Sequence, residues 1–316
     1  MKSISILVAT LALATSVAAQ TYPSKPIRLV TQGPAGSLSD NIVRTNGKVL
    51  GESMGQPVVI DNKPGADGVI AAADVQKAAP DGYTLLFATN SPMAAVPAMK
   101  KNPPYDPVAD FTPITNVGHF TFFLFVNASV PAKTLPQLLA YARANPGKLS
   151  YGSGNSTGIV GMAQTLSLAK VNMLHVPYKG EPQAITDLVG GRIDMMWATP
   201  TTGLSLVKDG KLRAVATSLK ERSPMLPEVP TVYETLPQFS IVSWGAIYGP
   251  AGMPRELVQR LNRELVAAMK NPEVVSAMER QGVALSPSTP EQLAAYLKEQ
   301  IEDWKRTVAI AGIQPE

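Results

Sequence analysis

Two short loops rich in glycine and serine carry the residue types best suited to binding an anion. They are Gly33-Pro34-Ala35-Gly36-Ser37-Leu38-Ser39-Asp40 and Gly152-Ser153-Gly154-Asn155-Ser156-Thr157-Gly158. Each follows a short apolar run typical of a strand and precedes a segment with helical spacing. Such a unit presents unpaired backbone N–H groups beside the positive end of a helix dipole. The loops begin 119 residues apart, at Gly33 and Gly152, and they predict two lobes that hold one anionic ligand between them.

The second loop also matches the Gly-x-Ser-x-Gly pattern of a hydrolase nucleophile, with Ser156 at its centre. In an α/β-hydrolase, an acidic residue and then a histidine follow the serine. No Asp or Glu lies between Ser156 and His175, and no histidine lies beyond His175. The triad order is therefore not met, and the sequence predicts binding by hydroxyl and amide groups, with no catalytic residue.

The composition argues against several other functions. The chain has no cysteine and only two histidines, which leaves no set of residues to bind a metal ion. No phosphate-binding Gly-x-Gly-x-x-Gly or Walker motif follows a strand, so no nucleotide cofactor is expected. The net charge of +4 becomes +3 without Lys2 (27 basic minus 24 acidic residues), and no basic cluster is present. Nucleic acid is therefore not an expected partner.

The segments around the two loops alternate between strand and helix signals, which predicts an α/β fold with largely parallel sheets. A β-rich stretch is expected over 114–126, and proline-rich irregular segments over 102–113 and 223–240. The other expected strands are 27–30, 56–60, 83–88, 149–151, 173–176, 193–197, 212–217 and 244–248. The expected helices begin with one capped by Ser39 or Asp40 and ending near 54, followed by 67–78, 134–145, 158–169, 181–189, 201–208, 254–270, 272–281 and 290–310.

The first nineteen residues have the features of a secretory signal peptide. Lys2 gives a positive start, an apolar run follows, and Val17-Ala18-Ala19 fits the cleavage rule, which predicts a periplasmic protein that begins near Gln20. In the mature chain, the last strand and helices are expected to return to the first lobe. The predicted lobes are then 20–121 plus 243–316, and 122–242, with two crossings that form a hinge.

Several stretches resemble one family across residues 22–313. They are Tyr22-Pro23-Ser24-Lys25-Pro26-Ile27-Arg28, Pro64-Gly65-Ala66, Ala79-Pro80-Asp81-Gly82-Tyr83-Thr84-Leu85-Leu86, Pro104-Tyr105-Asp106-Pro107, His175-Val176-Pro177-Tyr178-Lys179-Gly180, Thr186-Asp187-Leu188-Val189-Gly190-Gly191, Asp194-Met195-Met196 and Leu226-Pro227-Glu228-Val229-Pro230-Thr231. In these stretches the chain resembles the Bug-family receptors, the extracytoplasmic solute-binding components of tripartite tricarboxylate transporters.

This resemblance implies a type II periplasmic binding protein fold, in which two α/β lobes with a two-crossing hinge close over a ligand cleft. The implied ligand is a small carboxylate, either a di- or tricarboxylate or an aromatic one. The implied partners are the membrane permease subunits, and the chain is expected to act as a monomer. The ligand-binding residues carried over by position are Pro34, Ala35, Gly36, Ser37, Ser39, Asp40, Thr89, Asn90, Ser153, Gly154, Asn155, Ser156, Thr157, Gly158 and Thr199.

The first loop departs from the family pattern at two positions. Gly33 stands where the family usually has an aromatic residue, and Ser37 stands where it usually has a glycine. The loss of an aromatic side chain predicts more room in the cleft, and hence a bulkier, aromatic carboxylate. Two other functions stay open at this point: a periplasmic subunit that senses a ligand for a signalling partner, and a periplasmic serine hydrolase.

Overall fold

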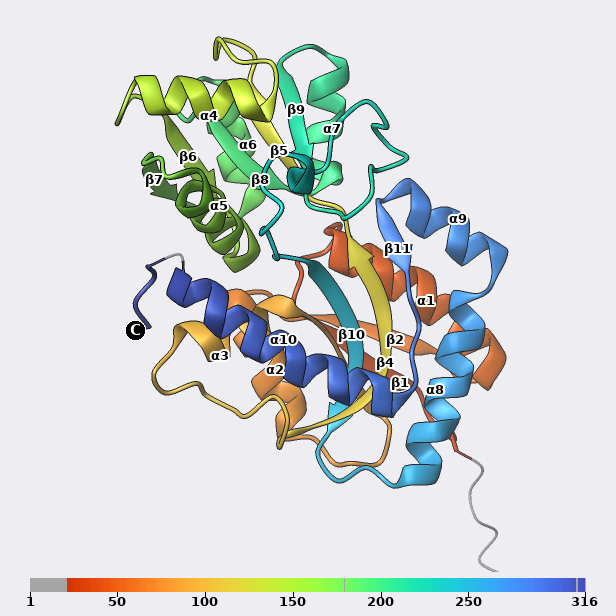
Figure 1. Cartoon of the computed structure of the whole chain (residues 1–316). Helices are drawn as coiled ribbons and strands as arrows, with labels where there is room; N and C mark the ends of the chain where they lie inside the picture. Colours follow the sequence, from red (N-terminus) through yellow and green to blue (C-terminus); the bar gives the residue numbers. More distant parts are fainter. Residues whose placement is uncertain (1–21, 179, 311, 316) are drawn as a thin grey trace, which may run out of the picture.

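Two β-sheets form the framework of the molecule. The computed structural model describes residues 22–178, 180–310 and 312–315, and in it the two sheets and their helices lie one above the other (Figure 1). The predicted signal peptide lies outside the described residues. Among the described residues, no helix combines the length and the apolar character needed to cross a membrane.

The first sheet has six strands in the order β11-β4-β10-β3-β1-β2. They are β1 (Ile27–Thr31), β2 (Val58–Asn62), β3 (Thr84–Thr89), β4 (Phe111–Phe120), β10 (Ser243–Pro250) and β11 (Val283–Leu285). Strand β1 pairs in parallel with β2 and β3. Strand β10 runs antiparallel to β3 and β4, and β11 runs antiparallel to β4.

The second sheet has five strands in the order β7-β6-β8-β5-β9. They are β5 (Phe123–Asn127), β6 (Ser150–Ser153), β7 (Leu174–Pro177), β8 (Met195–Ala198) and β9 (Leu212–Thr217). Strand β6 pairs in parallel with β7 and β8, and β5 runs antiparallel to β8 and β9.

Helices cover both faces of each sheet because each helix has an apolar stripe that must be buried. The first sheet is packed between α1 (Leu38–Met54), α8 (Arg255–Met269) and α9 (Pro272–Arg280) on one face and α2 (Val69–Gln76), α3 (Val96–Met99) and α10 (Pro290–Ile310) on the other. The second sheet has α6 (Glu181–Val189) and α7 (Pro200–Lys208) on one face and α4 (Leu135–Ala144) and α5 (Ser156–Ala169) on the other.

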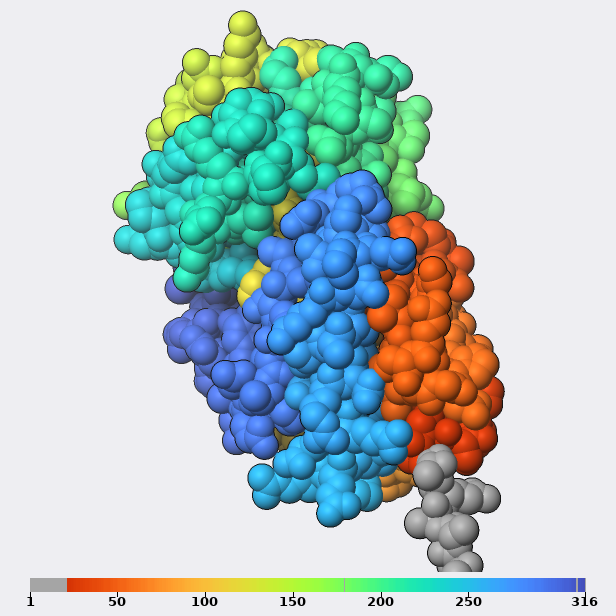
Figure 2. Space-filling view, turned by 90° about the vertical axis from the view of Figure 1, so that its right-hand side faces the viewer, coloured from red at the N-terminus to blue at the C-terminus, as the bar shows by residue number. Residues whose placement is uncertain are grey.

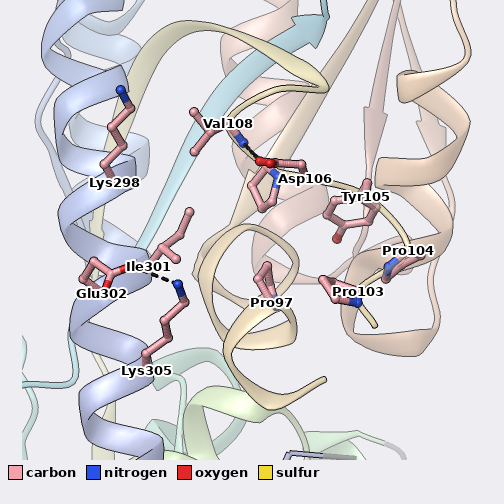
Figure 3. Close-up of a pocket in the computed structure, with 11 residues that line it drawn as sticks. Pro97, Pro103, Pro104, Tyr105, Asp106, Val108, Lys298, Ile301, Glu302 and Lys305 are labelled. Atoms are coloured by element: carbon pink, nitrogen blue, oxygen red, sulfur yellow. Dashed lines mark hydrogen bonds and ion pairs between the residues drawn. The ribbon is translucent and has the colours of Figure 1, made fainter. Parts of the chain in front are cut away.

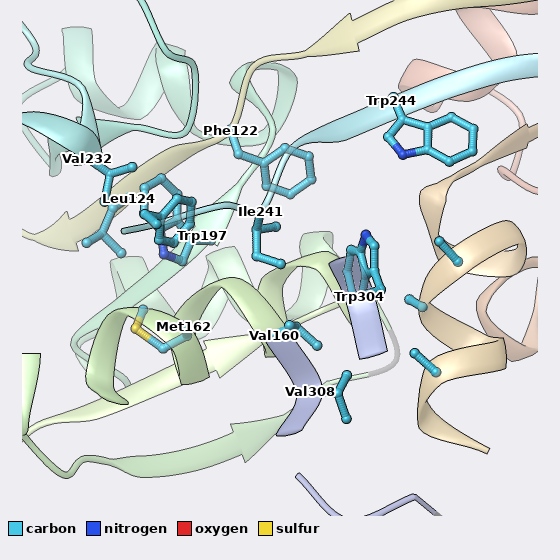
Figure 4. Close-up of a cluster of buried hydrophobic side chains, with 14 of the residues drawn as sticks. Phe122, Leu124, Val160, Met162, Trp197, Val232, Ile241, Trp244, Trp304 and Val308 are labelled. Carbon is cyan, nitrogen blue, oxygen red and sulfur yellow. The ribbon is translucent and has the colours of Figure 1, made fainter. Parts of the chain in front are cut away.

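One buried apolar cluster extends from the first sheet into the second. It includes Val30 and Leu86 on the first sheet and Leu124 on the second. Where the two parts meet, Val160 of α5 lies beside Trp304 and Val308 of α10 (Figure 4). The space-filling view shows the parts touching on another side, where α9 reaches toward the second sheet's segments (Figure 2). The two sheets therefore share a continuous core on the side of α10.

The α/β class is confirmed, and the helices that begin at Pro272 and Pro290 start where the sequence predicts. One expectation about a helix start was wrong. The side chain that caps α1 is Ser37, which accepts a hydrogen bond from the Asp40 N–H, and not Ser39 or Asp40. The structure also has elements that the sequence analysis did not predict: a π-helix η2 (Ser91–Ala95) followed by α3, and β11 between the C-terminal helices.

The expectation of largely parallel sheets was also wrong, since both sheets are mixed. The chain leaves the first sheet in β4 and returns in β10, so these two neighbouring strands must run in opposite directions. Strand β5 starts where the chain enters the second sheet, whereas β9 ends where the chain leaves it, so they too run in opposite directions. Hydrophobic periodicity identifies such strands but does not set their direction.

Candidate functional site

The turns that follow the parallel strands of both sheets lie on the edges where the two sheets face each other. Strands β1, β2 and β3 run in the same direction as β4, so their carboxyl ends lie at the edge from which the chain crosses to β5. Strands β6, β7 and β8 run opposite to β5, so their carboxyl ends lie at the same crossing. This is the position at which α/β sheets bind ligands.

The first loop is shaped by the carboxylate of Asp40. One oxygen, Oδ2, accepts hydrogen bonds from the Gly36 N–H (2.8 Å) and from Arg44 Nε (2.9 Å), while Oδ1 accepts from Asn62 Nδ2 (2.9 Å). Burial acts to raise the pKa of Asp40, but these hydrogen bonds outweigh it, so that the pKa lies below its usual value. Asp40 is 2% exposed and holds the loop in place, and its direct contact with a ligand stays a prediction.

Serine side chains fill the space directly beside Gly33. Gly33 is buried, and a Cβ atom built on it would collide with the Ser37 hydroxyl and lie 2.8 Å from Ser39 Cβ. The two departures from the family pattern therefore compensate each other, because the serine at 37 fills the space that a side chain at 33 would need. The width of the cleft and the preference for a bulkier, aromatic carboxylate stay predictions.

The second loop is organised by Asn155, which is the N-cap of α5. Its Oδ1 accepts a hydrogen bond from the Gly158 N–H at 2.8 Å. Gly154 allows the loop to approach α6 closely, since a Cβ there would lie 2.5 Å from the Gly180 carbonyl carbon and 2.8 Å from Glu181 Cα. The glycine at 154 thus has a packing reason that is independent of any ligand.

Ser153 and His175 form a serine–histidine contact that the sequence did not predict. His175 Nε2 lies 2.6 Å from Ser153 Oγ, and the His175 ring stacks on Tyr151 with the centroids 4.7 Å apart. Burial lowers the pKa of His175, which favours the neutral ring. Ser153 is 1% exposed, so its hydroxyl is buried. Ser156, the serine of the Gly-x-Ser-x-Gly pattern, is hydrogen-bonded to Ser91 and not to His175.

Glu181 joins three of the turns and was missed by sequence reasoning. Its Oε1 accepts from Asn155 Nδ2 at 2.9 Å, and its Oε2 accepts from the Thr199 N–H (3.2 Å), Thr199 Oγ1 (2.7 Å) and Thr202 Oγ1 (3.1 Å). Burial raises the pKa of Glu181, although all these hydrogen bonds act to lower it. An acidic residue in the first turn of a helix is common, so the sequence offered no signal for this role.

Two hydrogen bonds connect the first-sheet turns to the start of α5. Asn90 Nδ2 donates to Thr157 Oγ1 at 2.8 Å, and Ser156 Oγ donates to Ser91 Oγ at 2.7 Å. Asn90 Oδ1 also accepts from Ser243 Oγ (3.2 Å), at the start of β10 where the chain crosses back. Each of these side chains is buried, so the structure joins the two sides of the site directly.

The structure brings together only part of the predicted site. Asn90 is hydrogen-bonded to Thr157, and Ser156 is hydrogen-bonded to Ser91, which lies next to Asn90 in the chain. Asn155 and Thr199 meet at Glu181, and Thr89 exchanges hydrogen bonds with Gln32. In the described part of the chain, the hydrogen bonds of the first loop go to α1 and Asn62 and not to the second loop. The predicted ligand-binding residues on the first loop therefore stay a prediction: Pro34, Ala35, Gly36, Ser37, Ser39 and Asp40.

A surface cavity of about 710 Å³ lies away from these turns, between the proline-rich segment 103–108 and α10 (Figure 3). Tyr105 lines its inner side and Lys298 and Lys305 lie on α10 at its other side. None of the predicted site residues lines it. In the described ranges, no three His, Asp or Glu side chains gather in a way that could hold a metal ion.

Comparison with known proteins gives one consistent family. The family model described as "Tripartite tricarboxylate transporter family receptor" matches residues 42–313. Protein BugT of Bordetella pertussis is 33% identical over 316 residues, which cover 98% of this chain and 96% of BugT. The structure of Rhodopseudomonas palustris Rpa4515 with adipate is 30% identical, with a TM-score of 0.87 over 93% of this chain and 100% of that one. The periplasmic binding protein BugD is 29% identical, with a TM-score of 0.84 and the same coverage.

Proposed function

Since the chain belongs to the receptor family of tripartite tricarboxylate transporters, we propose that it binds a small carboxylate between two lobes and delivers it to a membrane permease. In this proposal the lobes are residues 20–121 with 243–316, and residues 122–242. The mature chain starts near Gln20 and acts in the periplasm. The similarity to periplasmic binding proteins supports the class of function, and the relative with adipate supports a carboxylate.

The observation that carries the proposal is the contact between turns that lie on different sheets. Asn90 and Ser91 follow β3 of the first sheet, while Ser156 and Thr157 start α5 after β6 of the second. Polar groups at such a meeting point can exchange their bonds to each other for bonds to a ligand. In a closed site, amide and hydroxyl donors would replace the water around a carboxylate.

Closure requires a hinge, and the two crossings provide a short one. The Thr121 N–H donates to the Gly282 carbonyl oxygen at 2.9 Å, and the Phe122 N–H donates to Ser218 Oγ at 3.2 Å. These bonds hold the first crossing on both sides. The lobes would therefore turn about a few residues near 121–122 and 241–243, and the bound ligand would set the population of the closed form.

The proposal describes a binding protein and assigns no catalytic residue. Ser156, the centre of the Gly-x-Ser-x-Gly pattern, donates its hydroxyl hydrogen to Ser91. His175 lies instead on Ser153, whose hydroxyl is buried. A serine nucleophile needs both a base and access to its substrate. In this conformation Ser156 has no histidine as its hydrogen-bond partner, and Ser153, which has one, is buried.

Thermal denaturation of residues 20–316, refolded to remove any bound ligand, tests the proposal. The ligands are aliphatic and aromatic mono-, di- and tricarboxylates, each paired with its neutral amide as a control. A ligand that binds only the folded state at about 100 times its Kd stabilises it by about 2.7 kcal/mol, which gives a shift of several degrees. We expect at least one carboxylate to give such a shift and its amide none. The absence of a shift with every carboxylate would refute the proposal.

Uptake of the carboxylate by cells distinguishes a role in transport from a role in sensing. A strain that lacks this protein should lose uptake of the carboxylate that binds it, and uptake should return with the wild-type chain. Normal uptake in the deletion strain would refute the role in transport while leaving carboxylate binding intact.

A further inference from the structure

Gln32 lies at the root of the first loop and contacts the turns after two other strands. It follows β1 directly and precedes Gly33, the first residue of the loop. A Cβ on Gly68, in the turn after β2, would lie 2.8 Å from Gln32 Oε1 and 3.0 Å from Gln32 Cδ, so the amide group packs against that turn. The same amide group forms two hydrogen bonds with Thr89, the last residue of β3. Gln32 therefore connects the carboxyl ends of three neighbouring strands.

The orientation of the Gln32 amide group is fixed by the backbone of Thr89. The Thr89 N–H can only donate, and it donates to Gln32 Oε1 at 3.2 Å. The nitrogen of the amide group then faces the Thr89 side chain, and Gln32 Nε2 donates to Thr89 Oγ1 at 2.7 Å. The reversed amide group would set Nε2 against the Thr89 N–H, which would place two donors opposite each other.

The hydroxyl oxygen of Thr89 has both of its acceptor positions occupied. Besides the bond from Gln32, Thr89 Oγ1 accepts a hydrogen bond from the Ser91 N–H at 3.2 Å. A hydroxyl group has two lone pairs and one hydrogen, so any further hydrogen bond of this group is one that it donates. Among the residues that the structure describes, Thr89 Oγ1 donates to no acceptor. Its hydrogen is therefore free to bond to a molecule that enters the site.

This hydroxyl group lies close to the contact between the two sheets. Thr89 ends β3 at the edge that faces the second sheet, and it is 8% exposed. The next residue, Asn90, donates to Thr157 Oγ1 at 2.8 Å. Ser91 accepts from Ser156 Oγ at 2.7 Å, also at the start of α5. A nearly buried donor without a protein acceptor at this position gains most from an acceptor on the ligand, because an unpaired buried donor is costly.

We infer that Gln32 is a positioning residue that commits the Thr89 hydroxyl group to donation, so that the site presents a fixed donor to a carboxylate oxygen of the ligand. The inference rests on the proposed function, because it adds a residue that prepares the same site for its ligand. A hydroxyl group without such partners rotates and can either donate or accept. An ionised carboxylate only accepts, so a donor that is already oriented suits it.

A double-mutant cycle on ligand affinity, measured by isothermal titration, tests the inference. Gln32→Glu keeps the length of the side chain, and its carboxylate can still accept from the Thr89 N–H. Its second oxygen cannot donate, so the Thr89 hydroxyl group donates to it and is lost to the ligand. Thr89→Val removes the hydroxyl group and keeps the shape of the side chain. The probe is adipate or, if the wild type does not bind adipate, the carboxylate that gives the largest shift in thermal denaturation.

Gln32→Glu also adds a negative charge, and two comparisons separate the charge from the hydrogen bond. Gln259→Glu adds the same charge at an exposed position of α8. Gln32→Glu in the Thr89→Val background adds the charge at the same position, but no hydroxyl group is left there to change direction. The difference between the losses of affinity in the two backgrounds therefore measures the coupling between Gln32 and the Thr89 hydroxyl group.

We expect Thr89→Val to weaken binding of the probe about tenfold, as the loss of one hydrogen bond to a charged group would. The loss caused by Gln32→Glu should be about tenfold larger with Thr89 present than in the Thr89→Val background. Gln259→Glu should bind like the wild type. Gln32→Met, which adds no charge, provides a second variant if Gln32→Glu melts at a lower temperature than the wild type, and its loss of affinity should likewise disappear in the Thr89→Val background.

Three results would overturn the inference and leave the proposed function standing. The first is a Thr89→Val variant that binds the probe as tightly as the wild type. The second is a Gln32→Glu variant that binds it as tightly as Gln259→Glu. The third is a loss of affinity on replacement of Gln32 that is the same in both backgrounds, which would indicate a structural role only. If the wild type binds no carboxylate at all, the proposed function itself fails, and this inference fails with it.

Discussion

Replacement of Glu181 by glutamine should destabilise the fold more than its conservative character suggests. The carboxylate accepts four hydrogen bonds from the turns after β6 and β8. A glutamine side chain has the same shape but can accept at only one of its two terminal positions. The hydroxyl groups of Thr199 and Thr202 can rotate to accept from an amide, whereas the backbone N–H of Thr199 cannot.

The magnitude follows from the donor that is left without an acceptor. A buried donor without a partner costs about 1–3 kcal/mol, so we expect Glu181→Gln to lower the free energy of unfolding by about 2 kcal/mol. Glu181→Ala leaves all four donors without the carboxylate and should cost about 3–5 kcal/mol. Since the bonds share one acceptor, their separate costs do not add.

The effect should also depend on pH in a definite direction. Burial raises the pKa of Glu181 in the folded protein, so the folded state keeps this proton over a range of pH in which the unfolded chain has lost it. The contribution of Glu181 to the free energy of unfolding is therefore greatest below its unfolded pKa and falls as the pH rises through the folded pKa. The cost of Glu181→Gln should be larger near about pH 4 than near about pH 8.

Urea denaturation of the wild type, Glu181→Gln and Glu181→Ala at both pH values measures these effects. The matched control is Glu279→Gln on the exposed side of α9, which should stay within about 0.5 kcal/mol of the wild type. A Glu181→Gln variant as stable as the control at both pH values would show that Glu181 does not organise these turns.

Two further predictions concern the glycine-rich loops. Burial and hydrogen bonding together leave the pKa of Asp40 lowered, so its stabilising contribution is complete above about pH 4 and is lost as the pH falls through the lower folded value. Asp40→Asn should therefore flatten the acid side of a plot of melting temperature against pH, and an unchanged acid side would contradict the role of Asp40 in the first loop. Gly154→Ala should lower the free energy of unfolding by about 1–3 kcal/mol, because its Cβ would lie 2.5 Å from the Gly180 carbonyl carbon. Gly161→Ala, within α5, meets only contacts of 3.6 Å or more and should be neutral or stabilising by up to about 1 kcal/mol. Equal effects of the two variants in urea denaturation would therefore contradict the close approach at Gly154.

The sequence by itself predicted the features that depend on near neighbours. The two strand–loop–helix turns, the α/β class and the helix starts at Pro272 and Pro290 follow from local periodicity and from residues that begin helices, and the structure has all of them. The family was visible in motifs spread over the whole chain and is confirmed by the comparisons. The exact cap was not predicted, since Ser37, Ser39 and Asp40 are all good N-cap residues.

The tertiary structure alone decided which of these residues meet. The bond between Asn90 and Thr157 joins positions 67 residues apart, and the bond between Glu181 and Thr199 joins positions 18 apart on different turns. Such contacts depend on strand order and direction, which hydrophobic periodicity does not encode. The sequence thus determined the two strand–loop–helix turns, and the packing of two mixed sheets decided which side chains meet at them.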